Sequence, residues 1–257
     1  MCTVSFIARQ RGYALAMNRD EKLSRAPGRP PKKISLAGHT VICPSEPGGG
    51  TWIALNDAGV AFALINWYAI KRTVLANPVS RGGVVKAVAA ETSPIKAFQV
   101  LRQLPLNRIR PFRLVGVFAP QQEIYEWRWD LQTLLCGKRP WKSQQWISSG
   151  YDEPAAQKAR SKTFRRALKQ RTAGNIGWLR RLHQSHAAGP GPFSTCMHRP
   201  DAATVSYTEI VASKHRATMA YCNAAPCQSR TVPNSLLIYS PGEGTGPTNS
   251  VISAKIL

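Results

Sequence analysis

Short apolar segments occur in pairs along this chain, and turn residues join the two members of each pair. The first pair, Cys2–Ala8 and Tyr13–Asn18, alternates in polarity around the turn sequence RQRG and predicts a β-hairpin. The pair Thr51–Leu55 and Val60–Asn66 is apolar almost throughout, so we expect this hairpin to be covered on both faces. Further strand pairs are predicted at residues 112–119 with 123–129 and at residues 204–212 with 217–223.

Helical periodicity separates these strand pairs in two places. Residues 80–91 and 93–104 predict two helices, the second with Ser93 as its N-cap and an apolar stripe of Ile95, Phe98, Leu101 and Leu104. A third helix is expected to start at Asp152, with Pro154 in its first turn; its inward residues would be Ala156, Phe164 and Leu168 and its basic residues would point outward. Residues 175–186 predict a fourth helix.

The order of elements is therefore strands, two helices, strands, two helices and strands. This order favours an α+β protein in which two sheets pack together with helices outside, and 257 residues suffice for such a core. We expect a single domain over residues 1–240 and a flexible tail over residues 241–257, which have loop composition. Residues 24–33 are rich in proline and basic residues and predict a surface loop.

The N-terminal hairpin brings a cysteine next to a charged segment. If residues 9–12 form a four-residue loop, the numbers of two paired residues add up to about 21, and Cys2 lies opposite Arg19. If Arg11 and Gly12 form a two-residue loop instead, Cys2 lies opposite Glu21. Opposed residues share one face with Cβ atoms ~5 Å apart. Either register therefore brings Asn18, Arg19 and Asp20 beside Cys2.

Cys2 can act as a nucleophile if Met1 is removed. Its free α-amine would have a pKa near ~8 and could take the thiol proton directly or through water. The Arg19 guanidinium would lower the pKa of the thiol, and Asp20 could bind the α-ammonium group. Nucleophile and base would then belong to one residue.

The chain is strongly basic, with 35 Lys and Arg against 13 Asp and Glu and a formal charge of +22. No acidic residue lies between Pro154 and Pro200. The electrostatic field of so many positive charges attracts polyanions, acidic surfaces or anionic substrates. Alternatively, these basic residues simply cover the outward, solvent-exposed faces of two helices and bind no partner. Because no nucleic-acid-binding motif accompanies it, the sequence disfavours a nucleic-acid partner.

No apolar run approaches the ~20 residues of a membrane span. Nothing at the N-terminus resembles a signal peptide, because Arg9 and Arg11 follow the short apolar stretch and do not precede it. The sequence therefore predicts a cytoplasmic protein whose six cysteines are reduced thiols.

Four segments together resemble the NRDE-motif family, whose eukaryotic relatives are called transport and Golgi organisation proteins. These segments are MCTVSF…NRDEK, GGTWIALNDAGVAFALIN, SSGYDEPAAQKAR and HQSHAAGPGPFSTCMHRPDAATVSYTEI…APC. The family is similar to N-terminal-nucleophile hydrolases of the choloylglycine hydrolase and penicillin acylase branch. The resemblance implies a four-layer αββα sandwich, which agrees with the order of elements above.

The resemblance also implies roles for single residues. Cys2 resembles the nucleophile of these hydrolases, and Arg19 and Asp20 resemble the residues that flank it. Asn66 resembles the amide of the oxyanion hole, which is commonly worth ~3 kcal/mol of barrier. Arg199 resembles a later active-site arginine.

Three further residues are expected to contact substrate. Ser149 stands where those hydrolases usually have a second asparagine, which argues against bile-salt-type or penicillin-type hydrolysis. His198 precedes a strand that the family motif aims at the active site, and Asn18 belongs to the NRDE segment beside Cys2.

Cysteine and histidine spacing does not predict a metal site. Cys196, His198, Cys222 and Cys227 lack CxxC spacing, and His183 and His186 are three residues apart instead of four. We therefore expect no metal and no resident cofactor.

Three functions remain open from the sequence. The first is an N-terminal-nucleophile cysteine hydrolase that acts on a non-peptide C–N amide bond of a small molecule. The second is a non-catalytic protein that holds haem or lipid, as the resemblance to the transport and Golgi organisation proteins implies, with Cys196, Met197 or His198 as an axial ligand to haem. The third is a polyanion-binding protein.

Overall fold

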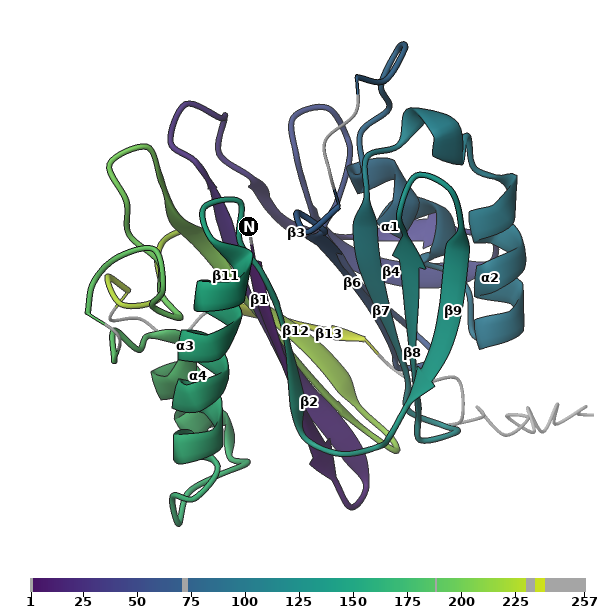
Figure 1. Cartoon of the computed structure of the whole chain (residues 1–257). Helices are drawn as coiled ribbons and strands as arrows, with labels where there is room; N and C mark the ends of the chain where they lie inside the picture. The colour runs from purple at the N-terminus through teal and green to yellow at the C-terminus, as the bar shows by residue number, and fades with distance from the viewer. Residues whose placement is uncertain (1, 71–73, 188, 230–233, 239–257) are drawn as a thin grey trace, which may run out of the picture.

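Two antiparallel sheets pack face to face, with helices on both outer faces (Figure 1). The computed structural model describes residues 2–70, 74–187, 189–229 and 234–238. A six-stranded sheet has the order β10-β1-β2-β11-β12-β13, and a seven-stranded sheet has the order β3-β4-β5-β6-β7-β8-β9. This four-layer arrangement is the α+β sandwich that the sequence predicts.

The strands of the six-stranded sheet are β1 (Cys2–Arg9), β2 (Gly12–Lys22), β10 (Gln144–Ser148), β11 (Ala202–Ser213), β12 (Ala217–Cys222) and β13 (Asn234–Ile238). Those of the seven-stranded sheet are β3 (Arg29–Leu36), β4 (His39–Ser45), β5 (Ile53–Asn56), β6 (Val60–Asn66), β7 (Phe112–Phe118), β8 (Glu123–Trp129) and β9 (Leu134–Arg139). The helices are α1 (Gly82–Val88), α2 (Pro94–Gln103), α3 (Glu153–Ala167) and α4 (Ile176–His183), with a 3₁₀ turn, η1, at Leu106–Arg108.

The N-terminal hairpin has the first of the two registers that the sequence leaves open. Cys2 lies opposite Arg19 on β2, and on its other side β1 pairs with β10, where Ser148 opposes Cys2. Because side chains alternate across a strand, Cys2, Val4 and Phe6 face the second sheet and belong to the core between the sheets. Thr3 and Ser5 face the helices α3 and α4.

Each helix pair covers the outer face of one sheet. Helices α1 and α2 pack on the seven-stranded sheet through Val84, Val85, Val88, Ala97 and Leu101. Helices α3 and α4 pack on β1, β2 and β11 through an apolar cluster that includes Phe164, Trp178, Leu179, Leu182 and Tyr207. The predicted order of layers therefore follows directly from the faces of the strands.

The two predicted helix starts agree with the structure, in which Ser93 and Asp152 are the N-cap residues of α2 and α3, but two residues lie on a different helix face from the one predicted. Asp152 caps α3 by accepting a hydrogen bond from Ala155 N at 2.9 Å. Ile95, predicted on the buried stripe of α2, is 70% exposed. Arg160, predicted on the outward basic face of α3, is fully buried, because it pairs with a buried carboxylate.

The predicted surface loop at residues 24–33 is partly wrong, since β3 begins at Arg29. This strand lies at the edge of its sheet, where proline is tolerated because one row of backbone groups needs no partner. The predicted set also lacks the edge strands β9, β10 and β13 and the inner strand β4. The tail predicted at residues 241–257 lies outside the described residues.

None of the helices in the described part of the chain combines the length and the apolar character that a membrane crossing requires.

Candidate functional site

The side chain of Cys2 lines a cavity of about 410 Å³ between the two sheets. Cys2 is 7% exposed, and Arg19 and Asp20 from the neighbouring strand line the same cavity. Asn66, at the end of β6 in the other sheet, completes the predicted set on the facing wall. Four predicted site residues, from the three strands β1, β2 and β6, thus meet at one cavity.

Arg19 is held against this cavity by contacts on two sides. Its guanidinium lies 4.4 Å from the centre of the Trp52 ring, and its Nη2 donates to Glu46 Oε1 at 2.8 Å. Because the Arg19 side chain is 6% exposed, these contacts fix the position of a cation with little access to water.

Opposing effects act on the pKa of the Cys2 thiol, and burial is the largest of them. Burial raises the pKa of the thiol above its ordinary value, and the Asp20 carboxylate adds to this rise. A hydrogen bond from the Asp20 backbone N–H and the charge of Arg19 act in the opposite direction and lower the thiol pKa. The site therefore supplies groups that stabilise a thiolate inside a cavity that otherwise disfavours one.

Asp20 points to the helix-facing side of β2, whereas Arg19 points between the sheets. The Asp20 carboxylate accepts a hydrogen bond from Thr204 Oγ1 at 2.6 Å and pairs with Arg160 Nη1 at 3.2 Å. Arg160 also donates to Thr3 Oγ1 at 2.7 Å. The acidic residue of the NRDE segment is thus anchored by α3 and β11 at the strand end that carries Cys2.

Asn66 presents an amide to the cavity. Its Nδ2 donates to Tyr68 Oη at 2.7 Å, which orients the amide and uses one of its two N–H groups. Arg81 lines the same wall and donates to Pro111 O at 3.1 Å. The pKa of Arg81 is lower than its ordinary value, mainly because the side chain is buried. A negative charge on the nearby Cys2 thiolate acts in the opposite direction.

Ser148, and not Ser149, is the hydroxyl residue directly opposite Cys2. Its Oγ accepts a hydrogen bond from the backbone N of Cys2 at 3.0 Å. Ser149 is 1% exposed at the end of β10, and its Oγ accepts from Tyr151 N at 3.3 Å. Ser149 does not line the Cys2 cavity.

Asn18 lies on the opposite face of β2 from this cavity. Its Nδ2 donates to the carbonyls of His183 and Thr195 at 2.9 and 2.8 Å, and its Oδ1 lies 3.0 Å from His183 Nδ1. The side chain is fully buried. Asn18 therefore joins β2 to the end of α4 and to the loop before β11.

His198 and Arg199 line a neighbouring cavity of about 570 Å³ that shares Arg19 with the first. Arg199 pairs with the Asp201 carboxylate at 2.8 Å and lies 4.9 Å from the centre of the Tyr151 ring. His198 contacts Cys196 and Cys227, and these residues, with His186, are the described group that could hold a metal. The structure thus places these two predicted residues beside the Cys2 cavity and not in it.

Sequence reasoning missed two arginines of the site, Arg81 and Arg160. Arg160 is hidden within a run of exposed basic residues, and the signal that could have found it is its position one turn from Ala156 and Phe164 on the buried face of α3. Arg81 precedes α1 in a loop and reaches the cavity only through tertiary packing of Gly82 against Gly50, whose Cβ would lie 2.9 Å from Gly82 Cα. Gly50, the third glycine of GGGTW, therefore serves close backbone approach.

Comparison with solved structures shows the fold. Penicillin V acylase from Agrobacterium tumefaciens superposes with a TM-score of 0.54 at 12% identity, over 93% of this chain and 86% of that chain. A C2A mutant of conjugated bile acid hydrolase from Clostridium perfringens gives a TM-score of 0.51 at 9% identity, over 92% of each chain. The predicted resemblance to the N-terminal-nucleophile hydrolase fold is confirmed.

Comparison of the sequence with curated proteins found no match. The sequence model of the family Transport and Golgi organisation 2 (TANGO2) matches residues 1–133. This match covers more than half of the 257 residues and contains both the NRDE segment and the strand that ends at Asn66. The chain therefore belongs to the TANGO2 family, on a fold of the N-terminal-nucleophile hydrolase type.

Proposed function

We propose that this protein is a cysteine hydrolase that cleaves a non-peptide C–N amide bond of a small molecule, with Cys2 as the nucleophile. The observation that carries the proposal is the position of the Cys2 thiol in the wall of the cavity, next to the Arg19 cation and across from the Asn66 amide. The cavity of about 410 Å³ has a size typical of small-molecule sites.

The α-amine of Cys2, exposed by removal of Met1, is the proposed base. It takes the thiol proton, and the thiolate sulfur forms a bond to the amide carbon of the substrate. The C–N bond then breaks, the protonated amine returns the proton to the leaving nitrogen, and a thioester remains on Cys2. Water adds to the thioester, releases the carboxylic acid and regenerates the thiol.

The walls of the cavity suit the charge that develops in this reaction. The second N–H of Asn66 Nδ2 is the proposed donor to the oxyanion, since its other N–H is directed to Tyr68. Asp20, which Arg160 and Thr204 hold in place, would accept a hydrogen bond from the α-ammonium group. Arg19 lowers the pKa of the thiol and so favours the attacking thiolate.

Trapping of the acylated protein tests this proposal. The purified full chain is mixed with a panel of small N-acyl amides, quenched in acid and examined by intact mass and peptide mapping. We expect the chain to lack Met1 and to carry one acyl group on Cys2. Cys2→Ala should abolish the adduct, whereas the matched variant of an exposed cysteine, Cys136→Ser, should keep it.

Two results would overturn the proposal. Complete retention of Met1 would remove the proposed base, and an adduct that persists in Cys2→Ala would place the reactive thiol elsewhere. A chain that lacks Met1, is not acylated by any amide of the panel and shifts the Soret band of added haem would instead support the ligand-holding function.

A further inference from the structure

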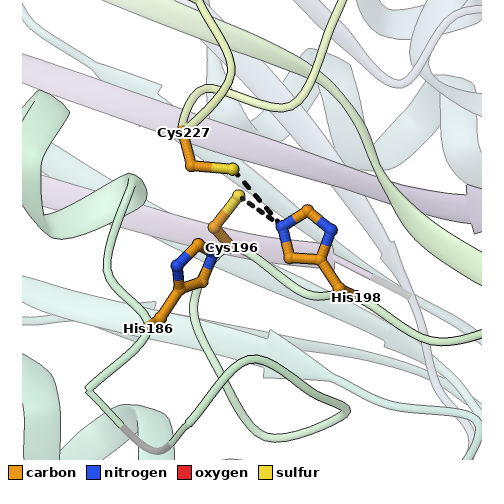
Figure 2. A group of neighbouring side chains, drawn as sticks. All are labelled: His186, Cys196, His198 and Cys227. Carbon is orange, nitrogen blue, oxygen red and sulfur yellow. Dashed lines mark hydrogen bonds between the residues drawn. The ribbon is translucent and has the colours of Figure 1, made fainter.

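Four side chains with metal-binding atoms converge at the end of the sandwich, outside the Cys2 cavity. Figure 2 shows them: His186, Cys196, His198 and Cys227 point their rings and thiols toward a common centre. One ligand atom from each residue lies within 4.8 Å of the others. The residues come from two loops: His186, Cys196 and His198 lie in the connection between α4 and β11, and Cys227 lies in the loop after β12.

The distances within this cluster are those of a tetrahedral site. Cys227 Sγ lies 3.3 Å and Cys196 Sγ lies 3.7 Å from His198 Nε2. Zinc bonds of ~2.3 Å to sulfur and ~2.05 Å to nitrogen at tetrahedral angles would separate sulfur and nitrogen ligands by roughly 3.5 Å. The rings of His186 and His198 lie 5.1 Å apart at an interplanar angle of 65°, so the two rings do not stack.

One buried nitrogen atom of the cluster, His186 Nε2, has no hydrogen-bond partner among the described residues. Buried polar atoms nearly always have a partner, because a lost hydrogen bond to water must be replaced. A cation bound between the ligands would supply that partner.

Hydrogen bonds hold the two loops in position without help from the ligand atoms themselves. Cys196 N donates to Ser185 O at 3.2 Å, which closes the first loop, between α4 and β11, on itself. Gln184 Nε2 donates to Pro226 O at 3.1 Å, which ties the first loop to the residue before Cys227. A β-bridge pairs His198 with Ala203 at the start of β11. The ligand atoms are therefore gathered by a scaffold of hydrogen bonds.

We propose that His186, Cys196, His198 and Cys227 bind one Zn²⁺ ion in a closed tetrahedral site. Two thiolates and two imidazoles are a ligand set that zinc prefers, and four protein ligands leave no position for substrate, which is typical of a structural site. Binding releases the two thiol protons, and the charges of the two thiolates balance that of the ion. A neutral cluster suits a site in which Cys196 is fully buried.

The site would also stabilise the position of Asp20. Met197 lies between two of the ligands, and its N donates to Thr204 Oγ1 at 2.8 Å. The same Oγ1 donates to Asp20 Oδ1 at 2.6 Å. A metal on Cys196 and His198 would thus fix the loop that orients Thr204 toward the NRDE segment.

The sequence pattern argues against this site for a specific reason. The Cys196-x-His198 pair is too short for a zinc-finger spacing, His186 precedes it without a recognised metal spacing, and Cys227 lies 29 residues after His198. The site exists only because α4 and the loop after β12 end next to the start of β11.

Metal content tests the proposal. The full chain is produced in zinc-supplemented medium, purified under reducing conditions without a polyhistidine tag, and analysed for zinc by mass spectrometry. We expect one zinc ion per chain, reduced to background in Cys227→Ser. The matched control Cys222→Ser, which changes a cysteine of β12 outside the cluster, should retain the zinc.

A second measurement on the unmodified chain covers the case in which Cys227→Ser does not fold. Zinc is removed and Co²⁺ is added; we expect thiolate-to-cobalt charge-transfer absorption and protection of Cys196 and Cys227, but not Cys136, from alkylation. Three results would each overturn the proposal. The first is an equal zinc content in the unmodified chain and in a folded Cys227→Ser variant, and the second is an absence of thiolate-to-cobalt bands. The third is a disulfide between Cys196 and Cys227 in the freshly purified chain.

Discussion

At the scale of single residues, buried polar side chains connect the first hairpin to the elements around it. Asn18 is the centre of one such network: its Oδ1 accepts from His183 Nδ1–H, since both donors of Asn18 are used on carbonyls. His183 Nε2 then accepts from Ser5 Oγ, 2.9 Å away. Ser5 Oγ in turn accepts from Gln145 Nε2. The network requires a neutral imidazole.

This requirement predicts a loss of stability in mild acid. Burial lowers the pKa of His183 to about 3, with a smaller contribution from the Arg160 cation. The unfolded chain therefore binds a proton on this residue below about pH 6.5, whereas the folded chain does not, so its stability falls as the pH falls. From about pH 7 to about pH 5 we expect a loss of roughly 2 kcal/mol from this residue.

Urea unfolding at both pH values checks the prediction in the native chain and in His183→Gln, which keeps a donor and an acceptor but cannot titrate. The variant should start less stable and lose less on acidification. If the two proteins lose the same free energy, His183 is not the titrating group.

At the scale of elements, the seven-stranded sheet delivers the facing wall of the cavity through one close backbone contact. Thr51 N donates to Gly82 O at 3.1 Å, and Gly50 packs against the backbone of Gly82 at the start of α1. The adjacent residue Arg81 reaches the cavity because this contact is so short. The helix position and the cavity wall are therefore coupled.

The substitution Gly50→Ala tests that coupling. The new Cβ would lie 2.9 Å from Gly82 Cα, so backbone must shift, with an expected cost of about 1–3 kcal/mol. We also expect slower acylation of Cys2, because Arg81 moves with α1. Gly48→Ala is the matched control, since nothing lies within 4 Å of its Cβ.

Thermal unfolding and the acylation rate of Cys2 are measured in both variants. Equal behaviour of Gly50→Ala and Gly48→Ala would show that the backbone contact at α1 does not shape the cavity.

At the scale of the whole molecule, the described ion pairs use few of the cations of a chain with net charge +22. Some arginines are compensated internally, such as Arg160 by Asp20 and Arg180 by Glu209. Many others on α3, such as Arg165 and Arg166, are exposed. Repulsion among such charges destabilises the compact state.

Salt should therefore raise the stability of this protein. Between low ionic strength and about 0.3 M sodium chloride, where screening acts within ~6 Å, we expect an increase in the free energy of unfolding of about 1 kcal/mol. Urea titrations at the two salt concentrations measure the difference. A decrease would mean that attractive pairs, such as Arg19 with Glu46, outweigh the repulsion.

The local pattern of the sequence determined the N-terminal hairpin and the order of layers. Alternating polarity and the turn at residues 9–12 act over short distances in the chain, so Cys2 opposite Arg19 could be predicted as one of two registers before any fold was known. Asp152 as the N-cap of α3 could be predicted for the same reason. The resemblance to a known family added Asn66 to this set.

Only the tertiary structure decided which polar residues share a cavity. Arg160 lies among exposed basic residues in the sequence but is buried against Asp20, and Arg199 lies beside the Cys2 cavity and not in it. The four ligands of the proposed zinc site come from two loops that no local pattern connects. Contacts between residues far apart in the chain depend on how whole elements pack, and periodicity within one element carries no information about that packing.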